Sequence, residues 1–311
     1  MTEKRRARGL SLMSGGLDSQ LAVRVLERAG AEVEGIAFES PFFSADAARR
    51  AAAALGAKLR VVDFTADIIS LVKSPPHGFG GAMNPCIDCH AAMIRRAGEM
   101  MAAEGLDFVA TGEVRGQRPM SQNAQSLLTV EKASGLKGRL VRPLSAKLLE
   151  PTIPELEGKL DRERLLDISG RSRERQIALA AEFGIVDYPS PAGGCKLTEE
   201  AFSRRLDDLM RHEGLDDLGL VGMLKYGRRF RLDGGSLVVL GRDRVENEFL
   251  ESFRFNGSRL FRPSGGRIGA TAFVPRLASP DDAATAQAIV DAYAKGTVPA
   301  DREPFRRWQI I

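Results

Sequence analysis

The chain of 311 residues has few of the features that mark a secreted or membrane protein. It contains only three cysteines, an odd number that makes a poor disulfide framework and is typical of a reducing compartment. No stretch approaches the roughly 18 consecutive apolar residues that a membrane span needs. The basic segment Met1 to Gly9 is not followed by a signal-type apolar core. These absences predict a cytoplasmic protein with no membrane partner.

Histidine, the large aromatic residues and excess charge are also scarce. The three histidines, His77, His90 and His212, are too scattered to suggest a histidine-based catalytic set. Trp308 and Tyr293 are too few for a row of stacking side chains. A net charge of +4 does not by itself indicate nucleic-acid binding, since ordinary soluble proteins carry as much. Affinity for an anionic partner would therefore come mainly from local clusters of positive charge.

No Gly-Lys-Ser/Thr sequence occurs, which excludes the common Walker-type phosphate loop. The segment Ser14-Gly15-Gly16-Leu17-Asp18-Ser19, here called the phosphate loop, lies instead between an apolar strand and an amphipathic helix. Two adjacent glycines let the backbone approach phosphate oxygens, and the helix N-terminus adds donors and a favourable dipole. Asp18 and Ser19 can contact the phosphates or a phosphate-bound Mg²⁺. A glycine turn with a capping side chain is the simpler alternative, but position and composition favour ATP.

Apolar runs alternate with helical patterns through the first third of the chain and predict a parallel sheet wrapped by helices. The expected strands and helices are Gly9 to Met13, Leu17 to Ala29, Val33 to Phe38, Ser44 to Leu55, Leu59 to Phe64, Ile87 to Glu104 and Asp107 to Thr111. Helices are expected at Ser172 to Phe183 and Thr198 to Arg211, and short strands with glycine turns after Gly214. The predicted domains are 1–160, a helical segment 161–214 that carries the third cysteine, and a smaller α+β domain 215–311.

At Ser14 to Ser19 the chain resembles the ATP pyrophosphatase (PP-loop) proteins of the adenine nucleotide alpha-hydrolase-like superfamily. The resemblance implies an α/β fold and cleavage of ATP to AMP and pyrophosphate, with adenylation of a carbonyl oxygen. In such folds the end of the second strand meets adenine and a later strand end faces the nucleotide. The nucleotide-binding residues that it implies are Ser14, Gly15, Gly16, Asp18, Ser19, Ala37, Phe38, Thr111 and Gly112.

The three cysteines lie beside glycine and proline rather than in periodic core patterns. Cys89 follows Cys86 by one helical turn, so both sulfurs can face one point, and Cys195 lies on a glycine-rich turn. Three thiolates can hold three irons of a 4Fe-4S cluster and leave the fourth iron open. Zinc with His90 as a fourth ligand is a second interpretation, and a persulfide on Cys195 resolved by Cys86 is a third. Buried small side chains are the simplest alternative.

The order Asn84-Pro85-Cys86-x-x-Cys89, then Thr111-Gly112, then Ser190-Pro191-Ala192-Gly193-Gly194-Cys195 resembles tRNA 2-thiouridylases and 4-thiouridine synthetase type tRNA sulfurtransferases. With the phosphate loop, the resemblance covers about the first two thirds of the chain. It implies uridine thiolation, with Cys86, Cys195 and Asp18 as catalytic residues and sulfide or a persulfide carrier as sulfur donor. The sequence departs from the usual pattern at Glu113, His90 and Lys196, which leaves the thiolated position open.

Two basic segments are candidates for RNA contact. Arg171 and Arg173 lie at an expected helix start, although such a run is more often a solvated face. Residues 227–248 resemble the RNA-binding domain of NFACT proteins, and an ordinary basic β-rich domain is the alternative. The expected RNA-binding residues are Arg171, Arg173, Lys225, Arg228, Arg229, Arg231, Arg242 and Arg244.

Together these features predict an ATP- and Mg²⁺-dependent tRNA sulfurtransferase that uses a three-cysteine 4Fe-4S cluster. Its expected partners are tRNA and a sulfur donor, and a homodimer is a possible assembly. Two other interpretations stay open. One is a PP-loop ligase or sulfur-insertion enzyme for a small molecule, against which the basic C-terminal domain argues. The other is a nucleotide-sensing RNA-binding protein with a structural metal.

Overall fold

The computed structural model describes residues 5–119, 121–190, 194–253 and 256–311. Contacts divide the chain into two units, Met1–Lys196 and Leu197–Ile311, each with its own sheet. The segment 161–214, expected as one piece, is shared between them. Its helix α7 (Glu174–Glu182) packs against α1 (Leu17–Arg28) in unit 1, whereas α8 (Glu200–His212) belongs to unit 2.

Unit 1 contains a five-stranded sheet in the order β3-β2-β1-β4-β5, and every pair in it is parallel. The three middle residues of the central strand β1 are buried, as expected for a strand covered on both faces. The predicted α/β class with a parallel sheet is therefore confirmed. The strands are β1 (Arg8–Leu12), β2 (Glu32–Glu39), β3 (Leu59–Asp63), β4 (Phe108–Ala110) and β5 (Leu140–Val141).

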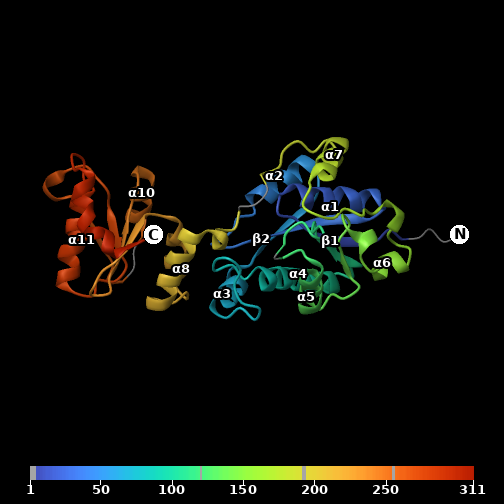
Figure 1. Cartoon of the computed structure of the whole chain (residues 1–311), viewed down its shortest axis with the longest axis horizontal. Coiled ribbons are helices and arrows are strands. Elements are labelled where there is room, and N and C mark those ends of the chain that lie inside the picture. Colours follow the sequence, from blue (N-terminus) through green and yellow to red (C-terminus); the bar gives the residue numbers. More distant parts are fainter. Residues whose placement is uncertain (1–4, 120, 191–193, 254–255) are drawn as a thin grey trace. The chain divides into compact units, whose positions relative to one another are not determined.

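Helices cover both faces of this sheet (Figure 1). On one face lie α1, α7 and α2 (Asp46–Leu55), and on the other lie α3 (Thr65–Lys73), α4 (Cys86–Ala103) and α5 (Ala124–Ser134). The apolar residues of α1 recur with helical spacing and face the core, among them Leu17, Leu21 and Val25. Shorter pieces complete the unit, namely η1 (Ala146–Leu148), α6 (Ile153–Leu156) and η2 (Arg162–Arg164).

The strand order places a topological switch point beside β1. Its two neighbours are β2, which follows it through α1, and β4, which follows β3 through α3 and α4. Crossovers that leave in opposite directions open a crevice at the carboxyl ends of β1 and β4, and open α/β sheets bind ligands at such crevices. The phosphate loop follows β1, and Thr111-Gly112 follows β4.

Unit 2 is a smaller α+β domain, as predicted. Its sheet has the order β10-β6-β7-β9-β8 and is antiparallel throughout. One face packs Phe230, Val238 and Leu240 against Ile289 of α11. The strands are β6 (Arg228–Arg231), β7 (Leu237–Leu240), β8 (Arg259–Phe261), β9 (Ala272–Val274) and β10 (Gln309–Ile310). The helices besides α8 are η3 (Lys196–Thr198), which begins at the last residue of unit 1, α9 (Leu218–Gly222), η4 (Met223–Lys225), α10 (Arg244–Ser252), η5 (Ser264–Gly266), α11 (Pro280–Ala292) and η6 (Pro299–Trp308).

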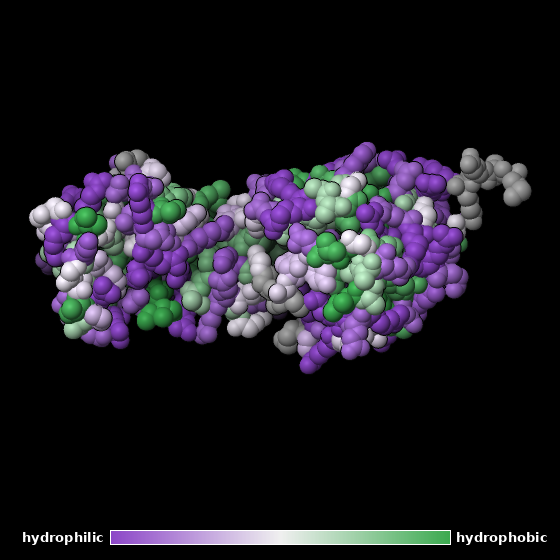
Figure 2. All heavy atoms as spheres, turned by 90° about the horizontal axis from the view of Figure 1, so that it is seen from above, coloured by the Kyte–Doolittle hydropathy of each residue, from purple (hydrophilic) through white to green (hydrophobic). Residues whose placement is uncertain are grey.

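Hydrophilic side chains predominate on the face drawn in Figure 2, and hydrophobic ones appear there as scattered patches. Within the described ranges, none of the helices has the length and apolar character that a bilayer crossing demands.

Candidate active site

The phosphate loop joins β1 to α1 at the switch point. Gly15 adopts a φ of +82°, and a Cβ there would lie 2.3 Å from the carbonyl carbon of Ala47, so only glycine is accommodated. Gly16 is the N-cap of α1 and provides no side-chain cap, which leaves the first helical amides available to an anion. The hydroxyl of Ser19 donates to the carbonyl of Gly16 at 2.8 Å and so ties the helix start to the loop.

The structure brings the predicted Thr111-Gly112 segment directly onto this loop. A Cβ on Gly112 would lie 2.6 Å from the carbonyl carbon and oxygen of Asp18 and 2.7 Å from the amide nitrogen of Ser19. Gly112 is therefore required by close backbone approach and not by a turn. The two segments, far apart in the sequence, form one surface at the crevice.

Asp18 is the centre of a buried polar cluster beside the loop. Gln117, from the segment that follows β4, donates to Oδ2 of Asp18 at 3.0 Å, whereas Oδ1 is buried and has no hydrogen-bond partner within the described residues. Burial raises the pKa of Asp18, and the hydrogen bond from Gln117 and the positive charges of Arg173 and Arg118 offset part of that rise. An unsatisfied, buried carboxylate oxygen at a phosphate loop suits a cation such as Mg²⁺.

Helix α7 and the residue at its N-cap contribute two further polar side chains to this cluster. Gln176 is fully buried, and neither of its amide atoms has a hydrogen-bond partner in the described part of the chain. Arg173, half-buried, acts on Asp18 electrostatically, and its Nε is likewise buried without a partner. Arg173 therefore lies at the phosphate loop, whereas Arg171 is exposed. Neither Gln117 nor Gln176 belongs to a recognisable motif, so sequence reasoning missed both.

Ala37 and Phe38 lie near the carboxyl end of β2, beside the phosphate loop strand. The amide of Met13 donates to the carbonyl of Ile36 at 2.8 Å, which holds the two strand ends together. Both side chains are buried, and the Phe38 ring packs edge-on against Phe64 with centroids 5.3 Å apart. Their contact with adenine stays a prediction.

The first two cysteines lie in the first turn of α4. Asn84 donates to the sulfur of Cys86 at 3.1 Å. Burial raises the pKa of the Cys89 thiol, and the neighbouring Cys195 and Cys86 raise it further. None of the three cysteines is in a disulfide. The fold thus brings the distant Cys195 into electrostatic range of Cys89, while Pro191, Ala192 and Gly193 of the third motif lie outside the described residues.

The thiols of Cys86, Cys89 and Cys195 are the candidate ligands for a metal centre. Three thiols without a fourth side-chain ligand match a 4Fe-4S cluster with one open iron in the number and type of donors. In the described portions of the chain, however, no three His, Cys, Asp or Glu side chains are grouped closely enough to hold a metal ion. The three sulfurs would have to close in on one another to bind a cluster. His90, the fourth ligand considered for zinc, lies instead next to a carboxylate, its Nδ1 3.5 Å from Oε1 of Glu113.

Asp88, between the two cysteines, organises the loop in front of them. It is 5% exposed and accepts from the backbone amide of His77 at 3.0 Å, and its other oxygen lies 2.6 Å from Nδ1 of His77. The Cys86-x-x-Cys89 turn is thereby fixed to the proline- and glycine-rich segment before it.

A buried ion network connects the cysteine helix α4 to the segment after β4 that packs on the phosphate loop. Arg142, 3% exposed, binds Glu113 at 2.9 Å and Glu131 of α5 at 3.0 Å, and the hydroxyl of Thr111 donates to Glu113 at 3.0 Å. Burial of Glu113 raises its pKa, but His90 and Arg142 outweigh burial and lower the pKa to about 2. Glu113 is therefore a charged link between α4 and the segment after β4.

The expected RNA-binding residues of unit 2 fall into two groups. Lys225, Arg242 and Arg244 are exposed, and Arg228 is half-buried over the ring of Tyr293. Arg229, in contrast, is 1% exposed and lies inside the unit. Arg231 is largely buried and is paired with the carboxylates of Asp208 in α8 and of Glu213. Direct RNA contact by each of these residues stays a prediction.

Residues 5–147 carry all five strands of unit 1, the phosphate loop, Gly112 and the first two cysteines. This segment matches the thiamine biosynthesis protein (ThiI) family. The ThiI match spans less than half of the chain and ends before Cys195.

Two curated relatives extend the comparison. The chain is 25% identical over 255 residues to the tRNA-specific 2-thiouridylase MnmA of Geobacter metallireducens. The matched region covers 69% of this chain and 66% of that protein. It is 36% identical over 112 residues to the tRNA-specific 2-thiouridylase MnmA of Sulfurimonas denitrificans, and this matched region covers 32% of either protein. The chain thus spans only part of the length of the relatives that it matches.

A solved complex of a 4-thiouridine synthetase with RNA and bound ATP is also similar to the chain. The two share 20% sequence identity at a TM-score of 0.42, over 70% of this chain and 52% of that one.

Proposed function

We propose that the chain is an ATP-dependent tRNA sulfurtransferase of the PP-loop superfamily that replaces a uridine carbonyl oxygen by sulfur. One observation carries the proposal. The segment after β4 packs Gly112 on the phosphate loop and, through Thr111 and Glu113, reaches His90 beside Cys89. A nucleotide crevice and a pair of thiols are therefore joined by one short stretch of backbone. The ThiI match and the two thiouridylase relatives support the same chemistry.

In the proposed reaction the uracil oxygen attacks the α-phosphorus of ATP, which forms an adenylated uridine and releases pyrophosphate. A sulfur nucleophile then attacks the adenylated carbon, and AMP leaves with the original oxygen. The open amides of α1 would hold the phosphates, and Oδ1 of Asp18, buried without a partner, would bind the Mg²⁺ that accompanies them. Arg173, which acts on the same carboxylate, would neutralise charge on the departing pyrophosphate.

The sulfur would be delivered at Cys86, Cys89 and Cys195. We infer that these thiols hold a 4Fe-4S cluster, which when bound would present hydrosulfide to the adenylated carbon. The number and type of donors support it. A persulfide on Cys195 is the competing route, and the absorption spectrum separates the two. Wild-type protein purified without oxygen should be brown, and the Cys195→Ala variant should lack the visible absorption band. A colourless, fully active wild-type protein would refute the cluster.

Unit 2 would position the RNA. The resemblance of 227–248 to NFACT proteins supports this role, together with the exposed cations Lys225, Arg242 and Arg244. Unit 2 would supply affinity and orientation, since the proposed chemistry lies in unit 1.

The test is a reaction of the anaerobic protein with ATP, Mg²⁺, sulfide and bulk tRNA, followed by separation of nucleotides and nucleosides. We expect AMP, pyrophosphate and a thionucleoside in equal amounts. Cys86→Ala should abolish the thionucleoside, and Asp18→Asn should abolish AMP as well, while Glu163→Gln on an exposed side chain should behave as wild type. AMP formation without any thionucleoside would refute RNA as the substrate and favour a small molecule.

A further inference from the structure

Arg229 of β6 is the largest fully buried side chain that the structure describes. It is 1% exposed, and none of its three guanidinium nitrogens has a hydrogen-bond partner within the described residues. An arginine carries five N–H donors and no acceptor, so a buried one without a partner loses its hydration and gains nothing in return. Such a group calls for a negatively charged or oxygen-rich partner.

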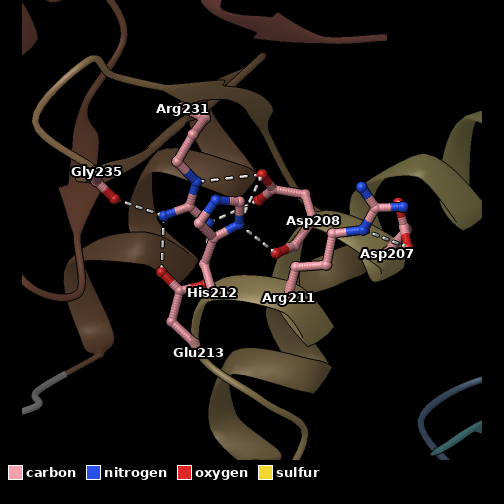
Figure 3. Close-up of polar contacts among 7 residues, drawn as sticks. All are labelled: Asp207, Asp208, Arg211, His212, Glu213, Arg231 and Gly235. Atoms are coloured by element: carbon pink, nitrogen blue, oxygen red, sulfur yellow. Dashed lines mark hydrogen bonds and ion pairs between the residues drawn. The ribbon is translucent and has the colours of Figure 1, made fainter.

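The acidic groups that act electrostatically on Arg229 are bound by another residue. Asp208 and Glu213 both act on Arg229 electrostatically, yet both are held by Arg231 (Figure 3). Arg231 donates to Asp208 at 2.7 and 3.1 Å and to Glu213 at 2.8 and 2.9 Å, and to the carbonyl of Gly235 at 2.7 Å. Because side chains alternate along a strand, Arg229 and Arg231 share one face of β6. The two carboxylates thus neutralise Arg231 and leave Arg229 without a partner.

A second arginine, Arg205, lies within electrostatic range of Arg229. Arg205 of α8 is half-buried, and its Nε is buried without a hydrogen-bond partner in the described part of the chain. Burial lowers the pKa of Arg229 to about 9, and the positive charge of Arg205 contributes to that shift. Burial lowers the pKa of Arg205, and the positive charge of Arg242 lowers it further. Two cations that repel each other inside a folded unit, each with a buried donor that has no partner among the described residues, would be stabilised by an anion.

We propose that Arg229 and Arg205 form a binding site for a phosphoryl group inside unit 2. Three nitrogens of Arg229 and one of Arg205 are available as donors. A terminal phosphoryl group offers three oxygens in a tetrahedral arrangement, which can accept from two guanidinium planes at once, whereas a carboxylate has only two oxygens in one plane. The group can come from free inorganic phosphate or from RNA. The site is separate from the phosphate loop and does not depend on the proposed enzymatic activity.

The test follows the melting of unit 2 in the full-length chain through its single tryptophan, Trp308. Inorganic phosphate should raise the melting temperature of unit 2 above that in chloride of equal ionic strength. In Arg229→Met the protein should melt at a higher temperature in chloride, since an unpaired buried charge is gone, and its affinity for phosphate should fall by at least about tenfold. Arg211→Met, which removes an arginine of α8 whose side chain is 70% exposed, is the matched control and should keep the response to phosphate.

Hydrogen exchange then locates the site and distinguishes the two sources. Phosphate that protects β6 and α8 in wild type, and not in Arg229→Met or Arg205→Met, supports free phosphate as the ligand. Protection of the same segments by bulk tRNA alone, lost in the same variants, supports an RNA phosphate. Asp18→Asn, which disables the phosphate loop, should leave both responses of unit 2 unchanged. If neither ligand protects β6 and α8, or if Arg229→Met responds as wild type does, the proposal is wrong.

Discussion

The side-chain amide of Gln117 donates a 3.0 Å hydrogen bond to Oδ2 of Asp18 and so orients the only carboxylate of the phosphate loop. With Oδ2 occupied, Oδ1 is the oxygen left for a ligand, and it is buried without a partner in the described residues. The bond spans 99 positions of the chain and joins the segment after β4 to the first turn of α1. A protein amide therefore orients the carboxylate group expected to meet the metal-bound phosphates.

Replacement of Gln117 should impair ATP cleavage more than folding. In Gln117→Leu the carboxylate loses its donor and can rotate, and a hydrogen bond to a charged group is worth about 1.5 to 3 kcal/mol, which corresponds to a tenfold or greater loss in kcat/KM. Pyrophosphate release measured against ATP and Mg²⁺ concentration tests this. Gln125→Leu, on an exposed residue of α5, is the control. Equal activity of the two variants would contradict a role for Gln117.

Gly112→Ala should damage the crevice through overpacking. The added methyl would lie 2.6 Å from the backbone of Asp18, so the loop must move, at a cost of about 1 to 3 kcal/mol in the free energy of unfolding. ATP binding measured by calorimetry should be lost or strongly weakened. Gly81→Ala, where a Cβ meets nothing within 4 Å and φ is ordinary, should bind ATP as wild type does. Retained ATP affinity in Gly112→Ala would show that the two segments do not need their close approach.

The stability of unit 1 should decline in acid because of Glu113. Its folded pKa of about 2 lies below the value of about 4.3 in an unfolded chain. The unfolded state therefore takes up the proton first as the pH falls, so the contribution of this group is complete above about pH 4.3 and is lost between there and pH 2. Its size is about 3 kcal/mol.

Hydrogen exchange of β4 and α4 at a series of pH values measures this effect, since Trp308 reports on unit 2 instead. The free-energy difference between wild type and Glu113→Gln should shrink through that pH window. Glu163→Gln, whose side chain is 88% exposed, should run parallel to wild type at all pH values. A constant difference for Glu113→Gln would contradict the assignment.

In Arg231→Met, unit 2 should unfold at a lower denaturant concentration than in wild type. The arginine binds two carboxylates whose side chains are 12% and 20% exposed, and removal of one partner of a buried ion pair costs about 3 to 5 kcal/mol. Tryptophan fluorescence in urea measures the change. Arg244→Met, where the arginine is 91% exposed, should leave the midpoint unchanged. If Arg231→Met lowered RNA affinity without changing stability, Arg231 would be a surface contact and not a structural one.

Local patterns in the sequence were sufficient to predict the strands β1, β2, β3 and β4 of the unit 1 sheet. The expected strand Val33 to Phe38 is β2, and the expected helix Leu17 to Ala29 is α1, each within one residue at either end. Hydrophobic periodicity and the glycines of the phosphate loop are properties of adjacent residues, so they can be read without knowledge of the fold. Helix α11 and strand β5 were missed, since α11 shows almost no segregation of apolar residues to one face and β5 has only two residues.

The sequence by itself thus determined the α/β class, the phosphate loop and the candidate thiols of this protein. Only the tertiary structure decided that Gln117, Gln176 and Arg173 surround Asp18, and that Glu113 connects the cysteine helix to the crevice. It also decided which basic residues of unit 2 are exposed and that Arg229 is buried. The physical reason is that charge and burial at one residue depend on groups brought close by packing, often a hundred positions away, and no local pattern records that distance.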